Sequence, residues 1–180
     1  MKNIKAKTIT TAGIIIALGV LIPQIFHLIG GKSLGNMLLP MHLPILIGGF
    51  ILPTVPAMLC GIIAPIISSL LTGMPPMPRL IFMVFELAAY GFFTSLFFKK
   101  LKLNAILSLV LSMLCGRAVY FLSLVIAINI LGISITGMTS AWAAVLAAVS
   151  TGIIGIIVQI IIIPIIVIAL KKAGIINDRK

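Results

Sequence analysis

The sequence predicts an all-α integral membrane protein, a single bundle of six transmembrane helices, on three observations. Apolar residues make up 62% of the chain and charged residues only 8%, whereas water-soluble domains carry about 25% charged residues. The apolar residues form long runs, not the alternating pattern of barrel strands. A bilayer core about 30 Å thick needs roughly 20 apolar residues per helix, so the chain has room for about six or seven crossings. No linker divides it, and we expect one membrane domain over residues 1-180.

Breaks in the apolar runs define six segments. They cover about Thr8–Leu28, Pro40–Leu52, Val55–Leu71, Arg79–Phe98, Leu103–Leu131 and Ser140–Leu170. The last segment is interrupted by Gly152, Gly155 and Pro164. The first follows lysines, as a signal peptide would, but no small-x-small cleavage site comes after Leu21. We therefore interpret it as a retained helix.

The basic residues predict the topology. Ten of the thirteen lie in three clusters: Lys2, Lys5 and Lys7; Lys99, Lys100 and Lys102; and Lys171, Lys172, Arg179 and Lys180. An even number of segments separates neighbouring clusters, so all three lie on one side, which the positive-inside rule makes cytoplasmic, together with both termini. The expected outer loops are then Ile29–Leu39, Gly73–Pro78 and Gly132–Thr139. A nucleic-acid interface would instead interleave basic and aromatic residues on a soluble surface.

Few ionisable residues remain near the outer side: His27, Lys32, His42, Arg79, Glu86 and Arg117. A charge in mid-membrane costs about 2.5 to 3.5 kcal/mol on insertion scales, so each needs a partner or a water-filled cavity. At about 1.5 Å per residue, Glu86 lies roughly 10 Å inward from Arg79, and Arg117 reaches the same depth from Leu103. The sequence predicts a Glu86–Arg117 pair. It either only fixes helix packing or belongs to an outward-facing polar pocket.

Two further features place residues at that pocket. Arg79, Met83, Glu86 and Tyr90 share one face of the fourth segment by their spacing. His42 opens the second segment between two prolines, where its ring faces either the pocket or lipid headgroups.

Motifs for chemistry are absent from the sequence. There is no phosphate-binding P-loop and no metalloprotease or nucleophile-elbow motif. Cys60 and Cys115 lie on different segments and form no metal-type cluster. We therefore expect no metal, no cofactor and no enzyme activity. An intramembrane enzyme that uses Glu86, His42 and Arg117, and a purely structural membrane protein, are the alternatives.

Small residues form stripes on two segments. Gly13 and Ala17 are four apart on the first, and Gly61 and Ser68 share a face of the third. Such stripes let membrane helices approach closely. They serve either packing within the chain or docking of a second membrane protein.

Two stretches, LPMHLPILIGGFILP and ISSLLTGMPPMPRLIFMVFELAAYG, resemble segments of the substrate-binding (S) component of energy-coupling factor (ECF) vitamin transporters. The resemblance covers most of the chain. The family's Ala-x-x-x-Ala motif on helix one here reads Gly13-x-x-x-Ala17. The resemblance implies that the protein lies in a prokaryotic plasma (inner) membrane and binds a vitamin in an outward-facing pocket closed by its outer loops. An ECF transmembrane coupling subunit and two cytoplasmic ATPase subunits would then supply the energy for uptake.

The resemblance also sets the expected site. The substrate-binding residues would be His42, Arg79, Glu86, Tyr90, Arg117, Tyr120, Trp142 and Asn36, and the partner-docking residues Gly13, Ala17, Gly61 and Ser68. The cationic balance suits a small carboxylate, and pantothenate is the favoured vitamin. Nicotinate and biotin are also carboxylates, and cobalamin needs mainly a wide cavity. Riboflavin, thiamine and pyridoxine would use more aromatic stacking than Tyr90, Tyr120 and Trp142 provide.

Overall fold

The computed structural model describes residues 6–130 and 140–176, which form helices and no strand. In chain order the elements are α1 (Ala6–Leu38), α2 (His42–Ile51), α3 (Thr54–Thr72), α4 (Arg79–Ser95), the π-helical turn η1 (Leu96–Lys100), α5 (Ala105–Val125), the π-helical turn η2 (Ile126–Ile130) and α6 (Ala141–Lys172). Each predicted segment coincides with helix to within a few residues. The all-α prediction is confirmed.

Five helical stretches are long and apolar enough to cross a membrane. They are Ala6–Gly31, Thr54–Thr72, Arg79–Lys100, Ala105–Asn129 and Leu146–Lys172. α2 has only 10 residues, about 15 Å at 1.5 Å per residue, or half of a bilayer core. The predicted six crossings are therefore supported for five segments, and α2 is too short to make the remaining one alone.

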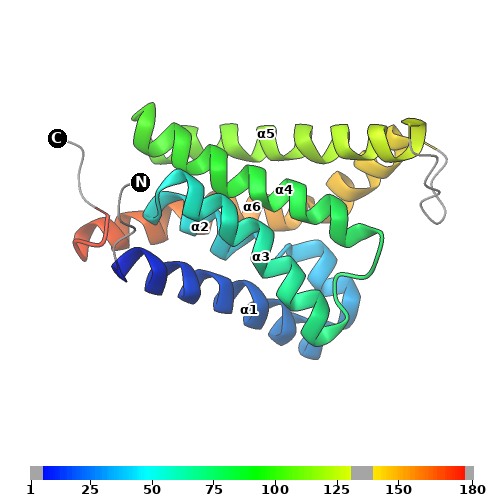
Figure 1. Ribbon diagram of the computed structural model, residues 1–180, viewed down its shortest axis with the longest axis horizontal. Helices are drawn as coiled ribbons and strands as arrows, with labels where there is room; N and C mark the ends of the chain where they lie inside the picture. The colour runs from blue at the N-terminus through cyan, green and yellow to red at the C-terminus, as the bar shows by residue number, and fades with distance from the viewer. Residues whose placement is uncertain (1–5, 131–139, 177–180) are drawn as a thin grey trace.

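The chain bends sharply between the first crossing and α2. Gly31 has φ 63° and ψ −163°, a backbone conformation open essentially only to glycine. Helix resumes over 32–38, so most of the predicted outer loop Ile29–Leu39 is helical in the structure. Leu39, with φ 49°, ends this short helix before α2 begins at His42. Figure 1 shows the chain turning back after the bend, with α2 leading away from that end. The piece 32–38 and α2 thus form a broken second helix.

α4 lies at the centre of the bundle and packs against α2, α3 and α5. Its closest approach is to α3, because Gly61 and Gly91 carry no side chain there. A Cβ on Gly61 would collide with the backbone of Leu87, and one on Gly91 with the backbone of Ala57. This is the close packing that small residues allow between membrane helices. Gly61 is buried inside the chain, so the predicted docking stripe on the third segment is an internal contact.

The two ends of the bundle differ in the number of lysines they carry. The first turn of α1, η1 and the last turn of α6 lie at the left in Figure 1, and the described lysines of the three basic clusters lie in these elements or, for Lys102, directly after η1. The bend in α1 and the turn over residues 73–78 lie at the right. This is the grouping that the positive-inside argument requires. The predicted loop Gly132–Thr139 lies outside the described residues, and the cytoplasmic side of the lysine end stays a prediction.

Candidate functional site

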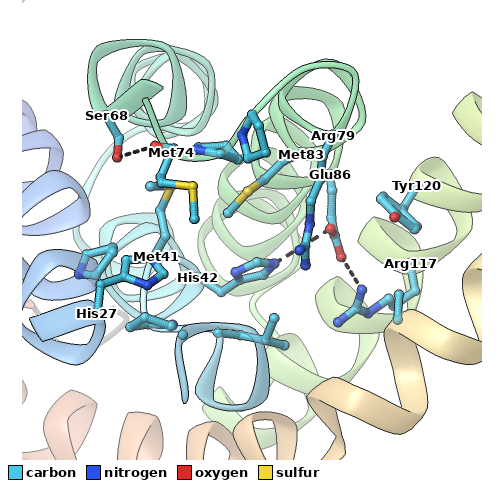
Figure 2. A pocket seen from close by; sticks show the side chains of 17 residues that line it. His27, Met41, His42, Ser68, Met74, Arg79, Met83, Glu86, Arg117 and Tyr120 are labelled. Atoms are coloured by element: carbon cyan, nitrogen blue, oxygen red, sulfur yellow. Dashed lines mark hydrogen bonds and ion pairs between the residues drawn. The ribbon is translucent and has the colours of Figure 1, made fainter. Parts of the chain in front are cut away.

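A cavity of about 80 Å³ is lined by residues at the end of the bundle that holds the bend in α1 and the turn over residues 73–78, opposite the three lysine clusters. A water molecule needs roughly 10–15 Å³ by the same kind of measure, so the cavity has room for several waters or a small ligand. Residues from α1, α3, α4, α5 and α6 line it, together with the break before α2 and the proline-rich turn after α3. Figure 2 shows its labelled side chains converging on this space.

Glu86 is the buried carboxylate at the wall of the cavity. It is 3% exposed and accepts hydrogen bonds from Arg117 Nη1 and from the Tyr90 hydroxyl, each at 2.9 Å. The His42 Nε2 atom lies 3.6 Å from its second oxygen. The predicted Glu86–Arg117 pair is therefore present, and it joins α4 to α5. Such partners are what a charge inside a membrane bundle requires.

The guanidinium group of Arg117 donates only some of the hydrogen bonds that it could form within the protein. Its Nη1 atom binds Glu86, but its Nε and Nη2 atoms are buried with no hydrogen-bond partner among the described residues. Both ring nitrogens of His42 also lack one there. A buried donor without a partner costs about 1–3 kcal/mol. These groups are therefore buried donors or acceptors without a hydrogen-bond partner beside the cavity.

Hydroxyl groups of α3 hold the proline-rich turn in place. Ser68 donates to the carbonyl oxygen of Met74 at 2.8 Å, and Ser69 donates to that of Pro75 at 2.9 Å. Proline has no N–H group, so a turn of this composition cannot satisfy its carbonyls internally and needs side-chain donors. Ser68 is fully buried and lines the cavity. It builds the cavity wall, and the prediction of a docking role for it is not supported by its position.

Three residues of α6, which we call the α6 strip, contact the break between the helix over 32–38 and α2: Gly152, Gly155 and Gln159. Gln159 Nε2 donates to the carbonyl oxygen of Leu39 at 3.2 Å, with Leu38 O at 3.5 Å. A Cβ on Gly155 would lie 2.6 Å from the carbonyl oxygen of Met37, so glycine is needed for this close approach. Gly152, Gly155 and Gln159 share one helix face by their spacing of three and seven. Sequence reasoning missed this strip, although a glutamine within an apolar helix on the face of two glycines was a usable signal.

The sequence as a whole was compared with known proteins. It matches the model of one family, described as the ECF transporter, substrate-specific component, over residues 7–167. The chain belongs to this family. Its members are substrate-binding components of transporters and not enzymes, and membership implies a small-molecule substrate and ECF membrane and ATPase modules as partners. No curated protein and no solved structure matches the chain.

The cavity of this S component contains five of the eight predicted substrate-binding residues: His42, Arg79, Glu86, Arg117 and Tyr120. Tyr90 is not part of the lining and instead donates to Glu86. Trp142 is not brought to the cavity, since it is 67% exposed and packs its ring 4.5 Å from that of Phe121. The side chain of Asn36 lies outside the described part of the chain.

Other lining residues of the S component were not among the predicted substrate-binding residues. The sequence had placed Met83 on the pocket face of the fourth segment and His27 near the outer side, whereas nothing pointed to Gly35, Leu39, Met41, Met74, Ala148 or the lining prolines. No sequence signal distinguishes a cavity-lining methionine from one that faces lipid, because both environments are apolar. Gly13 and Ala17, the predicted docking pair, are exposed on α1.

The α6 strip generates a stability prediction. Gln159→Leu removes the side-chain donor to Leu39 and should lower the free energy of unfolding by about 0.5–1.5 kcal/mol, because the carbonyl oxygen keeps only its bond from the His42 N–H. Ile161→Leu, at a 57% exposed position of the same helix, is the control and should change little. Thermal unfolding of both variants in detergent measures the difference. Equal unfolding temperatures for the two variants would show that Gln159 does not stabilise the backbone at the break before α2.

Proposed function

We propose that this S component takes a small vitamin into the cavity from the outer side of a prokaryotic plasma membrane. The observation that carries the proposal is the pair of unpartnered Arg117 donors, Nε and Nη2, at the wall of a cavity. The whole chain acts as a single membrane domain over residues 1-180. An ECF transmembrane coupling subunit and two cytoplasmic ATPase subunits then drive delivery to the inside.

The charges of the lining favour an anionic vitamin. Two guanidinium groups, of Arg79 and Arg117, face one carboxylate, of Glu86, which leaves one positive charge when the histidines are neutral. A charge-assisted bond to a carboxylate would neutralise it. Pantothenate is the vitamin that the sequence favoured, and nicotinate and biotin carry the same group. Cobalamin would depend on the width of the cavity and not on its charge.

The geometry disfavours the two alternative functions. One oxygen of Glu86 accepts two hydrogen bonds and the other faces His42, so the carboxylate serves as a structural anion more readily than as a catalytic base. A purely structural membrane protein would have no use for buried arginine donors beside a cavity, since each costs free energy.

The exposed face of α1 supports a docking surface for the coupling subunit. Gly13 and Ala17 are exposed there, and a Cβ built on Gly13 would meet no atom within 4 Å. Small residues allow a partner helix to approach closely at such a position. The pair lies toward the lysine end of α1, far along the helix from the cavity.

The proposal predicts that this chain alone is sufficient for vitamin binding but not for transport. The purified chain alone, in liposomes, should bind its vitamin but accumulate none, because it has no P-loop and no ATPase subunit of its own. Addition of the coupling subunit and both ATPases with ATP should restore uptake of the radiolabelled vitamin. Concentrative uptake by the isolated chain would contradict the proposal.

The exposed face of α1 predicts that changes there affect assembly with the coupling subunit but not vitamin binding. Gly13→Leu and Ala17→Trp should leave folding and vitamin binding intact but abolish assembly with the coupling subunit, because bulk is added where a partner helix would pack. Ile165→Trp, at a 61% exposed position of α6, is the matched control and should assemble normally. Affinity and co-purification of the partner are to be measured on one preparation. Joint loss of both in the α1 variants would show that this stripe packs within the chain.

A further inference from the structure

The lining of the cavity divides into two chemically different halves. Figure 2 shows Arg79, Glu86, Arg117 and Tyr120 on one side and His27, Met41, Ser68 and Met74 on the other, with His42 between them. The apolar residues of the lining are Pro23, Leu39, Pro40, Met41, Met74, Pro75, Pro76, Met83 and Ala148. A ligand that fills the cavity therefore contacts charge at one end and apolar surface at the other.

The cationic half is suited to a single carboxylate. Nε and Nη2 of a guanidinium lie on one side of the group and form a fork that binds both oxygens of a carboxylate. In Arg117 these are the two buried atoms without a partner, while Nη1 is held by Glu86. The bond to Glu86 fixes the direction of the fork before a ligand arrives. The one positive charge that remains in the lining is balanced by a monoanion, whereas a dianion would leave a negative charge uncompensated.

The fork is covered in this structure, so a ligand must displace its immediate neighbours to reach it. Nε and Nη2 of Arg117 are buried, and Gly152 of α6, where a Cβ would lie 3.6 Å from Nη2, adds no side chain to the cover. His42 Nε2 faces Glu86 at 3.6 Å, and its Nδ1 is buried with no hydrogen-bond partner within the described chain. When it carries the ring proton, Nδ1 can add a donor to the same anion.

The apolar half offers few donors to a polar ligand. Four of its residues are prolines, which have no N–H group. The polar side chains of this half are Ser68, whose hydroxyl already donates to Met74 O, and His27, whose Nδ1 lies 3.3 Å from Gly31 O. Most hydroxyl and amide groups of a ligand would lose their water here with little in return. Methionine thioethers instead adapt to apolar and sulfur-containing shapes and make favourable contacts with rings.

We infer that the substrate is a monocarboxylate with a mainly apolar body, its carboxylate bound by the Arg117 fork beside His42 and its body lying against Met41, Met74 and Met83. This inference rests on the proposed function and narrows it. It places biotin, whose body is a thioether ring and an alkyl chain with one ureido group, ahead of pantothenate, whose body carries two hydroxyls and an amide.

Ligand pairs that are similar in shape but differ in charge test whether the carboxylate of the substrate contributes to binding. Binding of biotin and biotinamide, nicotinate and nicotinamide, and pantothenate and pantothenol to the purified chain is measured by calorimetry. The tightest-binding acid should lose at least about tenfold in affinity in its uncharged partner, the equivalent of one charge-assisted bond. Equal affinity within that pair would overturn the role of the carboxylate.

The same set of ligands tests whether the part of the substrate beyond its carboxylate is mainly apolar. Biotin should bind at least about tenfold more tightly than pantothenate, and Met83→Ser should weaken biotin binding while Met83→Leu preserves it. Pantothenate as the tightest ligand would overturn the apolar-body inference and leave the proposed function standing. If no acid of the panel binds, the molecules that co-purify with the chain are identified by mass spectrometry. An apolar monocarboxylate would support the inference, and a cationic, uncharged or dianionic molecule would overturn it. No bound small molecule at all would overturn the proposed function as well.

Discussion

A buried carboxylate in a membrane bundle must be neutralised, and the position of Glu86 imposes that constraint on this structure. Its partners come from three helices: His42 from the start of α2, Tyr90 from its own α4, and Arg117 from α5. Removing one partner of such a pair leaves an uncompensated charge in low dielectric, which is more costly than never having had the pair. The same contacts that hold α2, α4 and α5 together also hold Arg117 at the wall of the cavity. In the proposed function, stability and binding therefore depend on one set of atoms.

The second constraint is the break in the chain before α2. Irregular backbone is tolerated at membrane depth only where protein or a cavity surrounds it, and here α6 supplies that protein. Glycines 152 and 155 let α6 approach the break, and Gln159 adds a side-chain donor to the Leu39 carbonyl, which also accepts from the backbone N–H of His42 at 3.0 Å. Ending the helix at this point presents Leu39, Pro40, Met41 and His42 together to the cavity. Discontinuous helices that form a binding site in this way are a general device of membrane transporters.

The sequence was sufficient for the parts of the structure that follow from local pattern and from charge. Long apolar runs located the helices, and the scarcity of acidic residues made Glu86 and Arg117 conspicuous enough to be paired by depth alone. It was insufficient where the outcome depends on tertiary packing. An apolar stripe does not say whether it faces lipid or a neighbouring helix, so the sequence left internal packing and docking open for Gly61, and it did not predict the exposed ring of Trp142 or the positions of Met41 and Met74 at the cavity. The helix over 32–38 was missed because glycines at 30 and 31 are a strong signal for a loop, and they produce only a bend.

The central claim is that Glu86 and Arg117 act as one unit, and a double-mutant cycle measures this directly. Glu86→Gln, Arg117→Met and the double variant are unfolded in mixed micelles against wild type. Each single change should lower the free energy of unfolding by about 3–5 kcal/mol, because it leaves the charge of the other residue buried without its partner. The double variant should lose no more than either single variant, which gives a large coupling energy. Losses that simply add would show that the two residues act independently and would contradict the account.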